Sequence, residues 1–523
     1  MIINTQKLSM GDFIANQVEK FSDREFIYDQ KVRISYGEFH DMVKKVANSL
    51  VKLGIKKGDN VGVCLPNWHE TAVLLFACAK IGATVVPFNP LYKRHEIEYI
   101  LKNSEPKILF VSEFFKINVG LELGKTLVEK IITVRFSEHG YLSFEQILEN
   151  GNSPTEKIQV QIDANEDLFC ILYTSGTTGM PKGVMTTHTS IVHCAFTLAN
   201  ELRCTEEDVF VVSAPLFHIF GITCNLATVI AAGARMVLVE KFHPEKILQL
   251  IEKEKVTVHQ GVPTMFLKEL EHENFSKYDL SSLRTGMVGA SPITPEQMKE
   301  IREKMGINLC QSFGITETGS VTFTKYDEDE EIICSTLGKP IDGVDIKIID
   351  ESGNILPNGE IGEIIVKSIG NMKGYYKMPE ETSKVIDKNG YYHTGDLGKL
   401  DENGNLHFVG RKKDLIIRGG YNIYPQEIEE LLKKYPKVSE VAVIGLPDKV
   451  LGEVVYAVIK LKPNMECTEE EIKDYVGKHM AKYKIPSGVM FINEFPVTAS
   501  GKIQKVKLRE SILKNAHMNS SNS

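Results

Sequence analysis

The sequence predicts an α/β fold with a large N-terminal region of layered α/β subdomains, a β-rich subdomain and a small α+β C-terminal domain. The chain has 523 residues, and a single hydrophobic core stops growing at about 250–300 residues, so several packing units are expected. Apolar β-type runs alternate with helix-period segments over most of the chain before Asp342. The pattern then changes to strand–turn–strand, and after Gly410 to a new mixture of helices and strands.

Strands and helices alternate in the N-terminal part. Apolar β-type runs stand at 61–65, 84–88 and 107–111, and segments of helical periodicity stand between them at 70–81 and 95–103. Strands separated by helices are typical of parallel sheets covered by helices. We therefore expect the first part of the chain to form layered α/β subdomains.

Turn residues mark the β-rich and C-terminal parts. The runs 344–349 and 361–367 flank a turn at 351–354, and further turns are predicted at 388–390 and 401–405. After Gly410, predicted helices at 425–435 and 468–479 alternate with strands at 440–445, 454–461 and 490–492. These changes predict an N-terminal domain over residues 1–410, a C-terminal domain over 411–515 and a disordered tail over 516–523.

Composition excludes several classes of function. The 61 Lys and Arg residues stand against 69 Asp and Glu residues, so the net charge of −8 offers no field to attract nucleic acid or anionic lipid. The nine cysteines are odd in number and contain no Cys-x-x-Cys pair, which argues against a disulfide framework and a zinc ribbon. Neither a secretory signal nor a transmembrane segment is recognised. We expect a cytoplasmic protein with small-molecule partners.

A glycine- and hydroxyl-rich loop follows the apolar strand at 168–173. It reads Thr174-Ser175-Gly176-Thr177-Thr178-Gly179 and continues through Pro181 to Lys182. Glycines let the backbone present its N–H groups, and the hydroxyls and the lysine add the donors and the charge that a polyphosphate requires. The loop is not a Walker A motif, because Pro181 stands where the second glycine belongs. A purely structural turn is the alternative interpretation.

This loop resembles the phosphate-binding signature of the adenylate-forming superfamily, which includes acyl-CoA synthetases, luciferases and peptide-synthetase adenylation domains. Four further segments resemble its other motifs in the same order, although Phe313 stands where tyrosine is usual: Gln311–Thr318, Tyr392–Asp396, Gly410–Pro425 and Pro496–Lys502. The sequence is most similar to bacterial medium- and long-chain fatty-acid–CoA ligases. The resemblance covers nearly the whole chain and implies that the C-terminal domain is mobile.

The resemblance implies that a carboxylic acid attacks Mg-ATP to give an acyl-adenylate and pyrophosphate, and that CoA then displaces AMP. The implied catalytic residues are Lys502, His218 and Glu317, with Mg²⁺ held by Glu317 and Thr174. The implied ATP- and AMP-binding residues are Thr174, Ser175, Gly176, Thr177, Thr178, Gly179, Lys182, Gly289, Ala290, Ser291, Ser312, Phe313, Gly314, Thr316, Asp396 and Arg411. Taken alone, Lys502 is a solvated lysine, His218 a core residue and Asp396 a turn residue.

For the second step, the resemblance implies a hinge at Lys413 and a CoA channel lined by Gly419, Gly420 and Tyr421. Before the final strand, Ile485 stands where relatives often have a second basic residue. This departure keeps an acyl carrier protein open as the acceptor in place of CoA. A homodimer is also open.

The acid pocket is expected from Phe217, Phe220, Val262 and Val288, beside His218. The segments that contain them offer no cation for a second carboxylate and no carboxylate for an amino group, which favours a fatty or otherwise hydrophobic monocarboxylic acid. An aryl acid stays open, because Phe217 and Phe220 could stack on a ring. A non-catalytic nucleotide-binding protein is disfavoured, since Lys502, Glu317 and Asp396 are all present.

Overall fold

The computed structural model describes residues 8–152, 160–174, 181–497 and 503–520. The chain divides into two compact units. Unit 1 comprises Met1–Ile346 and Val366–Tyr392, and unit 2 comprises Lys347–Ile365 and His393–Ser523. The predicted α/β class is confirmed, and the boundary predicted at residue 410 falls inside unit 2.

One sheet of unit 1 is largely parallel and runs in the order β7-β6-β5-β3-β4-β8-β9. Its strands are β3 (Asn60–Cys64), β4 (Thr84–Pro87), β5 (Ile108–Val111), β6 (Lys130–Thr133), β7 (Leu142–Ser143), β8 (Leu168–Thr174) and β9 (Lys182–Thr187). Strands β3, β4 and β5 are buried along their whole length, as expected of parallel strands covered on both faces. The last pair, β8 and β9, is antiparallel and brackets residues 175–180.

A second sheet of unit 1 runs in the order β16-β15-β14-β13-β12-β10-β11-β1-β2. Its strands are β1 (Glu25–Tyr28), β2 (Arg33–Ser35), β10 (Val209–Val212), β11 (Arg235–Leu238), β12 (Val258–Gly261), β13 (Thr285–Gly289), β14 (Asn308–Ile315), β15 (Gly319–Phe323) and β16 (Lys339–Pro340). The pairs from β1 through β14 are parallel. The carboxyl ends of β12, β13 and β14 therefore meet at one edge, which is where open α/β sheets bind ligands.

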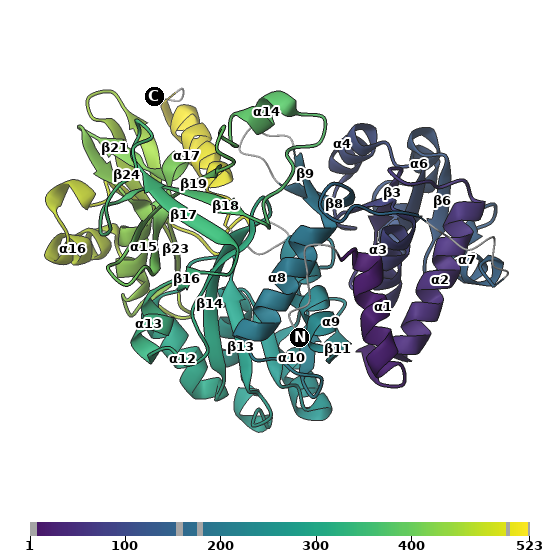
Figure 1. Ribbon diagram of the computed structural model, residues 1–523. Helices are drawn as coiled ribbons and strands as arrows, with labels where there is room; N and C mark the ends of the chain where they lie inside the picture. The colour runs from purple at the N-terminus through teal and green to yellow at the C-terminus, as the bar shows by residue number, and fades with distance from the viewer. Residues whose placement is uncertain (1–7, 153–159, 175–180, 498–502, 521–523) are drawn as a thin grey trace. The chain divides into compact units, whose positions relative to one another are not determined.

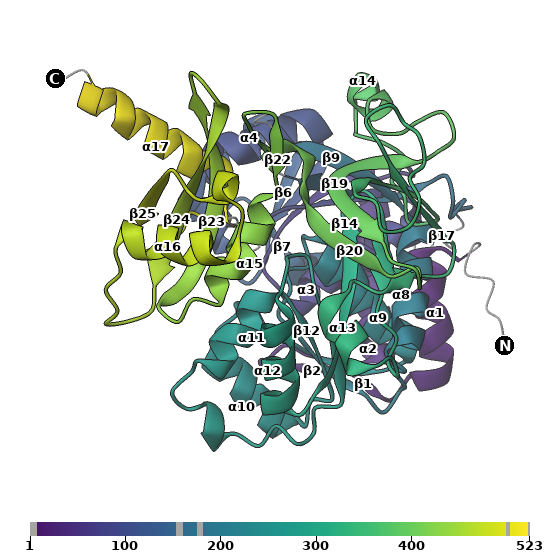
Figure 2. The ribbon, with the colours of Figure 1, turned by 90° about the vertical axis from the view of Figure 1, so that its left-hand side faces the viewer.

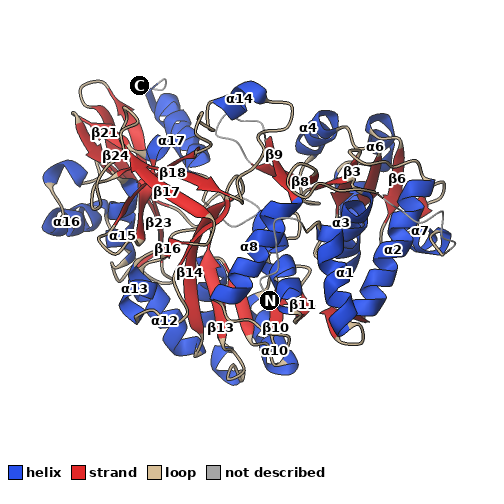
Figure 3. Ribbon diagram, in the orientation of Figure 1, coloured by secondary structure: helices blue, strands red, loops and turns tan. Residues whose placement is uncertain are grey.

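Helices surround these sheets. They are α1 (Met10–Phe21), α2 (Tyr36–Lys52), α3 (His69–Ile81), α4 (Arg94–Ser104), α5 (Glu113–Asn118), α6 (Leu121–Leu127), α7 (Phe144–Asn150), α8 (His188–Glu201), η2 (Phe220–Ala227, a π-helix), α9 (Thr228–Ala232), α10 (Pro244–Glu254), α11 (Pro263–Leu270), η3 (Phe275–Lys277), α12 (Pro295–Met305), α13 (Glu330–Ser335) and α14 (Pro379–Ser383). Helix α3 is apolar on almost every face because it is buried, and it packs beside α1 and α2 (Figure 1, Figure 3).

The main core of unit 1 joins helices to strands of both sheets. Its buried aromatic side chains include Phe39 of α2, Phe76 of α3, Phe169 of β8 and Phe210 of β10. Within the described ranges, no helix combines the length and the apolarity that crossing a bilayer requires.

The remaining strands form two sheets. One has the order β17 (Val344–Ile349), β18 (Gly362–Ser368), β19 (Tyr392–Leu400) and β20 (Leu406–Arg411). The other, in unit 2, has the order β22 (Tyr421–Ile423), β21 (Ile416–Arg418), β24 (Gly452–Leu461) and β23 (Val438–Asp448), with β25 (Gly488–Phe491) paired to β24.

Helices cover both faces of the second of these sheets. The helices are α15 (Pro425–Lys433), α16 (Glu469–His479) and α17 (Lys505–Ser520) (Figure 2). Alternate residues of β23 face opposite sides: Val441 and Val443 pack with α15 and α16, whereas Ala442 and Ile444 pack with α17. Short 3₁₀ turns stand at η4 (Lys412–Asp414) and η5 (Lys482–Lys484). Helix α17 extends through residues 516–520, which the sequence predicts to be a disordered tail.

Candidate active site

The residues on either side of the predicted phosphate-binding loop belong to the paired strands β8 and β9. Thr174, at the end of β8, lies opposite Lys182, at the start of β9. The predicted binding residues Ser175, Gly176, Thr177, Thr178 and Gly179 lie outside the described residues. The pairing nevertheless places a hydroxyl and a cation on the two strands from which the loop departs.

Lys182 is tied to the segment that follows β18. Its Nζ lies 2.6 Å from Oε2 of Glu381 on α14 and 5.0 Å from the centre of the Tyr375 ring. The Lys182 and Lys384 ammonium groups lower the pKa of Glu381 to about 2. The cation predicted to meet ATP phosphate is thus positioned by a carboxylate and an aromatic face.

Glu317 meets the hydroxyl of the same tyrosine and lies in the turn between β14 and β15. The Tyr375 hydroxyl donates to Glu317 Oε1 over 3.1 Å and lies 3.2 Å from the Tyr392 hydroxyl. The Met372 N–H donates to the Glu317 carbonyl over 2.8 Å. Burial and the Glu317 charge raise the pKa of Tyr375, so its hydroxyl stays protonated as a donor. A carboxylate beside phosphate oxygens is a donor set that suits Mg²⁺.

Two groups of the implied ATP- and AMP-binding residues lie at the ends of adjacent strands, β13 and β14. Gly289 at the end of β13 pairs with Ser312 of β14, and a Cβ on Gly289 would stand 2.9 Å from the Ser312 carbonyl oxygen. The next residue, Ala290, adopts a left-handed φ of 65°, a strained conformation that is common at functional sites. Gly314 allows the close return of β15, because a Cβ there would stand 2.4 Å from the Gly319 carbonyl oxygen. The structure thus brings the 289–291 and 312–316 segments together.

The predicted acid-pocket residues are only partly brought together. Nδ1 of His218 accepts the Phe220 N–H over 3.2 Å, and Phe220 opens the π-helix η2. Phe220 packs in a cluster with Met287, whereas Val288 points to the opposite face of β13 and joins a different cluster. Phe217 and Val262 are half-buried on the loops before η2 and α11.

In unit 2, the carboxylate of Asp396, one of the implied ATP- and AMP-binding residues, is buried at 4% exposure. Nε of Arg411 on β20 lies 3.3 Å from Asp396 Oδ1 on β19, and the two residues are paired in register. The Asp396 N–H donates to Thr394 Oγ1 over 3.0 Å. Gly395 has a φ of 68°, which gives the strand a local kink that a glycine accommodates.

The predicted hinge and CoA-channel residues also lie in unit 2. Lys413 stands in the 3₁₀ turn η4 after β20. Gly419 and Gly420 have φ values of 57° and 85° and form the tight turn of the β21–β22 hairpin, which requires positive φ at both positions. Lys502 lies outside the described residues.

An aromatic pair lies next to this hairpin. The rings of Tyr421 and Tyr483 are stacked with centres 4.6 Å apart and planes 13° apart, and Tyr421 is 58% exposed. The Arg418 guanidinium donates to the carbonyl oxygens of Tyr483 and Ile485 over 2.8 and 3.1 Å. Lys484 is ion-paired with Glu427. The pair gives unit 2 an exposed aromatic surface held by the Arg418 hydrogen bonds.

Family comparison identifies the class of enzyme. The family model for AMP-binding enzymes matches residues 14–376, and the model for the AMP-binding enzyme C-terminal domain matches residues 427–502. The chain belongs to the AMP-binding enzyme family. This confirms the resemblance that the ordered motifs indicate.

Named relatives of this AMP-binding enzyme include acyl-CoA synthetases. It is 35% identical to YngI of Bacillus subtilis (strain 168), described as a candidate acyl-CoA synthetase, over 98% of both chains. It is 32% identical to the mitochondrial medium-chain acyl-CoA ligase ACSF2 of Mus musculus, covering 98% of this chain and 88% of the mouse protein.

Solved structures of the same fold are also similar. ATP-bound MatB from Rhodopseudomonas palustris has a TM-score of 0.88 and 32% identity, covering 96% of this chain and 99% of MatB. The anthranilate CoA ligase AuaEII in complex with anthranoyl-AMP has a TM-score of 0.90 and 28% identity, covering 98% of both chains.

Sequence reasoning missed three residues that position the site of this AMP-binding enzyme. Tyr375 and Glu381 connect to Glu317 and Lys182, although their segment contributes to the sequence argument only through its general resemblance. Asn67 holds the loop before His218, because its amide donates to the Ala214 carbonyl over 2.9 Å and accepts the Leu216 N–H over 2.8 Å. A polar residue buried at 3% exposure gives no signal in a single sequence.

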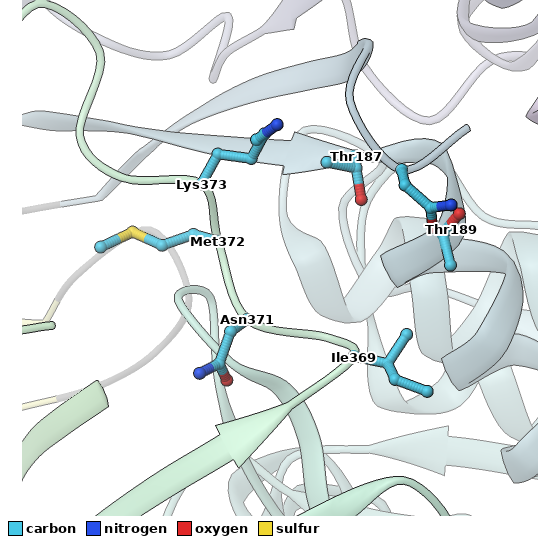
Figure 4. Close-up of a pocket in the computed structure, with 7 residues that line it drawn as sticks. Thr187, Thr189, Ile369, Asn371, Met372 and Lys373 are labelled. Atoms are coloured by element: carbon cyan, nitrogen blue, oxygen red, sulfur yellow. The ribbon is translucent and has the colours of Figure 1, made fainter. Parts of the chain in front are cut away.

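A pocket of ≈ 440 Å³ lies between the start of α8 and the loop after β18 (Figure 4). It is lined by Thr187 and Thr189 and, from the loop after β18, by Ile369, Asn371, Met372 and Lys373. Lys373 in its wall is ion-paired with Glu166. None of the described lining residues is one that the sequence predicts to bind ATP or the acid.

A cluster elsewhere in unit 1 contains residue types that can bind a metal, but an arginine already balances its carboxylates. Ligand atoms of Asp29, His69 and Glu70 lie within 4.8 Å of one another. Arg135 is ion-paired with Asp29, and its Nε lies 2.7 Å from Glu70 Oε1. A guanidinium between both carboxylates supplies the positive charge that a metal would bring.

Proposed function

We propose that this chain is an acid–thiol ligase that activates a hydrophobic carboxylic acid with Mg-ATP and transfers the acyl group to CoA. The acid carboxylate attacks the α-phosphorus of ATP, pyrophosphate leaves, and the CoA thiol then displaces AMP from the acyl-adenylate. The observation that carries the proposal is that Tyr375 contacts both charged groups: its ring lies near Lys182 Nζ, and its hydroxyl donates to Glu317. Such an arrangement suits a polyphosphate, since it sets a cation and a carboxylate at fixed positions.

Each residue of this arrangement has a separate task. Lys182 would attract the phosphates, and Mg²⁺ held by Glu317 and Thr174 would neutralise their charge. Tyr375 would keep the Glu317 carboxylate in place, since its hydroxyl donates to Oε1. Asp396 would accept the ribose hydroxyls, with Arg411 beside it. Lys502 is proposed, on the resemblance alone, to bridge the acyl carboxylate and the α-phosphate.

CoA is the proposed acceptor, and an acyl carrier protein is the second candidate. The exposed Tyr421–Tyr483 stack offers a flat surface for an adenine ring, which favours CoA. Lys484 would serve a phosphate only after leaving Glu427. We also propose a reducing, cytoplasmic compartment, which the free cysteines of the described residues support.

The acid is proposed to be of medium chain length. The relative ACSF2 is named as a medium-chain acyl-CoA ligase. Phe220 and Met287 are apolar, as a pocket for a fatty acid requires. An aryl acid is the alternative that AuaEII, a ligase for anthranilate, favours.

Pyrophosphate release tests the proposal. The enzyme is given Mg-ATP with fatty acids of increasing chain length and with aryl acids, each with and without CoA. Multiple turnovers only when CoA is present would establish a CoA ligase and name its acid. A single burst that CoA does not relieve would favour the carrier protein, and no release with any acid would refute the proposed function.

A further inference from the structure

Gln260 is a buried polar side chain that the mechanism does not use. It is the third residue of β12 and is 0% exposed. Neither its Nε2 nor its Oε1 has a hydrogen-bond partner among the described residues. A primary amide that is buried without partners is destabilising, so a ligand that meets both atoms would offset that penalty.

The fold determines which way this side chain points. Successive residues of a strand face opposite sides of the sheet. His259 faces α11, because its Nε2 lies 3.0 Å from Glu269 Oε2 and its ring packs on Phe266. Gln260 therefore faces the other side, together with Val258, which packs in the cluster that contains Ile222 of η2.

One neighbour on that side packs with Phe220, a residue predicted to line the acid pocket. In the parallel register Gln260 pairs with Met287 of β13, so the two side chains share a face. Met287 packs in one cluster with Phe220, whose ring carbon Cε2 lies 3.8 Å from the position of a Cβ on Gly289. The amide thus shares its face of the sheet with the apolar Met287, which packs with the Phe220 ring.

The helix facing this layer is itself irregular. Residues 220–227 form a π-helix, a rare conformation that recurs at functional sites. Within it, the Asn225 amide donates to the Phe220 carbonyl over 3.1 Å, while Oδ1 of Asn225 is buried without a partner among the described residues. Buried polar atoms that lack a partner in the described part of the chain therefore occur on both β12 and η2.

We propose that Gln260 determines the specificity of the acid site by hydrogen-bonding one neutral polar substituent, a hydroxyl or oxo group, on the chain of a hydrophobic acid. This rests on the acid-activating function proposed above. The amide donates and accepts, which matches a hydroxyl or a carbonyl oxygen. A second carboxylate would need a cation, and the described neighbours Val258, Met287 and Phe220 provide none.

The test compares acids of one chain length. Decanoate is measured against hydroxy- and oxodecanoates substituted at successive carbons, as kcat/KM for pyrophosphate release with Mg-ATP and CoA. The wild type should prefer one substituted acid over decanoate. Gln260→Leu should reduce that preference by about tenfold or more, because one hydrogen bond to the substrate is lost.

Met287→Leu is the matched control, since it alters the shape of the same layer without changing its hydrogen-bonding groups. It should change kcat/KM for both acids by a similar factor and leave the preference in place. Thermal unfolding checks that Gln260→Leu is folded, and Gln260→Met replaces it if it is not. Activity with an unchanged preference in the Gln260 variants would overturn this inference and leave the function standing. Absence of pyrophosphate release from every acid would instead refute the proposed function.

Discussion

Replacing Tyr375 with phenylalanine would remove one hydroxyl from the centre of the candidate site. The hydroxyl donates to Glu317 Oε1 over 3.1 Å, and the aromatic ring that faces Lys182 Nζ would remain. The ring is 6% exposed and packs with Val184 and Met372, so the fold should tolerate Tyr375→Phe. The effect should therefore fall on the two partners of the hydroxyl, the Glu317 carboxylate and the Tyr392 hydroxyl, and the kinetic effect on the orientation of Glu317.

The magnitude follows from the type of bond. A hydrogen bond to a charged group contributes about 1.5–3 kcal/mol, and about 1.4 kcal/mol corresponds to a factor of ten. Tyr375→Phe should thus lower kcat/KM for Mg-ATP by about tenfold to a hundredfold. Because Glu317 is the proposed Mg²⁺ ligand, the Mg²⁺ concentration that gives half-maximal activity should rise as well.

ATP–pyrophosphate exchange without CoA is the suitable assay, because it isolates adenylate formation. Tyr376→Phe is the matched control, since its hydroxyl accepts from Asn60 Nδ2 over 3.1 Å and does not reach Glu317 in the described contacts. Equal losses in the two variants, or wild-type kinetics with Tyr375→Phe, would show that the Tyr375 hydroxyl does not position Glu317.

Three further predictions address other parts of the site. Gly289→Ala should lower the free energy of unfolding and raise KM for ATP, because its Cβ would stand 2.9 Å from the Ser312 carbonyl oxygen. An unchanged unfolding midpoint together with an unchanged KM would contradict this. Lys502→Ala should abolish adenylate formation but spare thioester formation from supplied acyl-AMP, and equal loss of both steps would refute its assigned role. Glu381 has a pKa of about 2 instead of 4.5, so the stability that its ion pairs with Lys182 and Lys384 contribute is complete above pH 4.5 and is lost as the pH falls towards 2. Unfolding midpoints of the wild type and Glu381→Gln should therefore converge at low pH, and a constant difference would contradict the ion pairs.

Sequence patterns predicted the fold class because apolar periodicity and turn residues are local signals. The alternation of strands and helices in the first part of the chain is confirmed by β3, α3, β4, α4 and β5 in that order. Ordered motifs likewise predicted the family, because glycines and charged residues at fixed spacings are visible in the sequence even when the residues they contact are unknown.

Contacts between distant segments were not predictable in the same way. Tyr375 meets Glu317 across 58 positions of the chain, and Lys182 meets Glu381 across 199, so neither pair has a local pattern. Val288 and Met287 are both apolar neighbours in the sequence, and only the pleat of β13 decides that Met287 shares a cluster with Phe220. Gln260 is a polar residue in a strand, and its burial depends on the elements that pack against its sheet.

Position 485 shows how packing changes the meaning of a sequence difference. An isoleucine in place of a base suggests weaker binding of CoA if the position is a surface contact. In the structure, Ile485 packs against the core of unit 2, and its Cδ1 lies 3.2 Å from the position of a Cβ on Gly477 in α16. Its carbonyl oxygen accepts a hydrogen bond from Arg418, which also donates to the carbonyl oxygen of Tyr483, the residue stacked on Tyr421. The residue therefore contributes packing that orients the aromatic pair, and its apolar character is compatible with CoA as the acceptor.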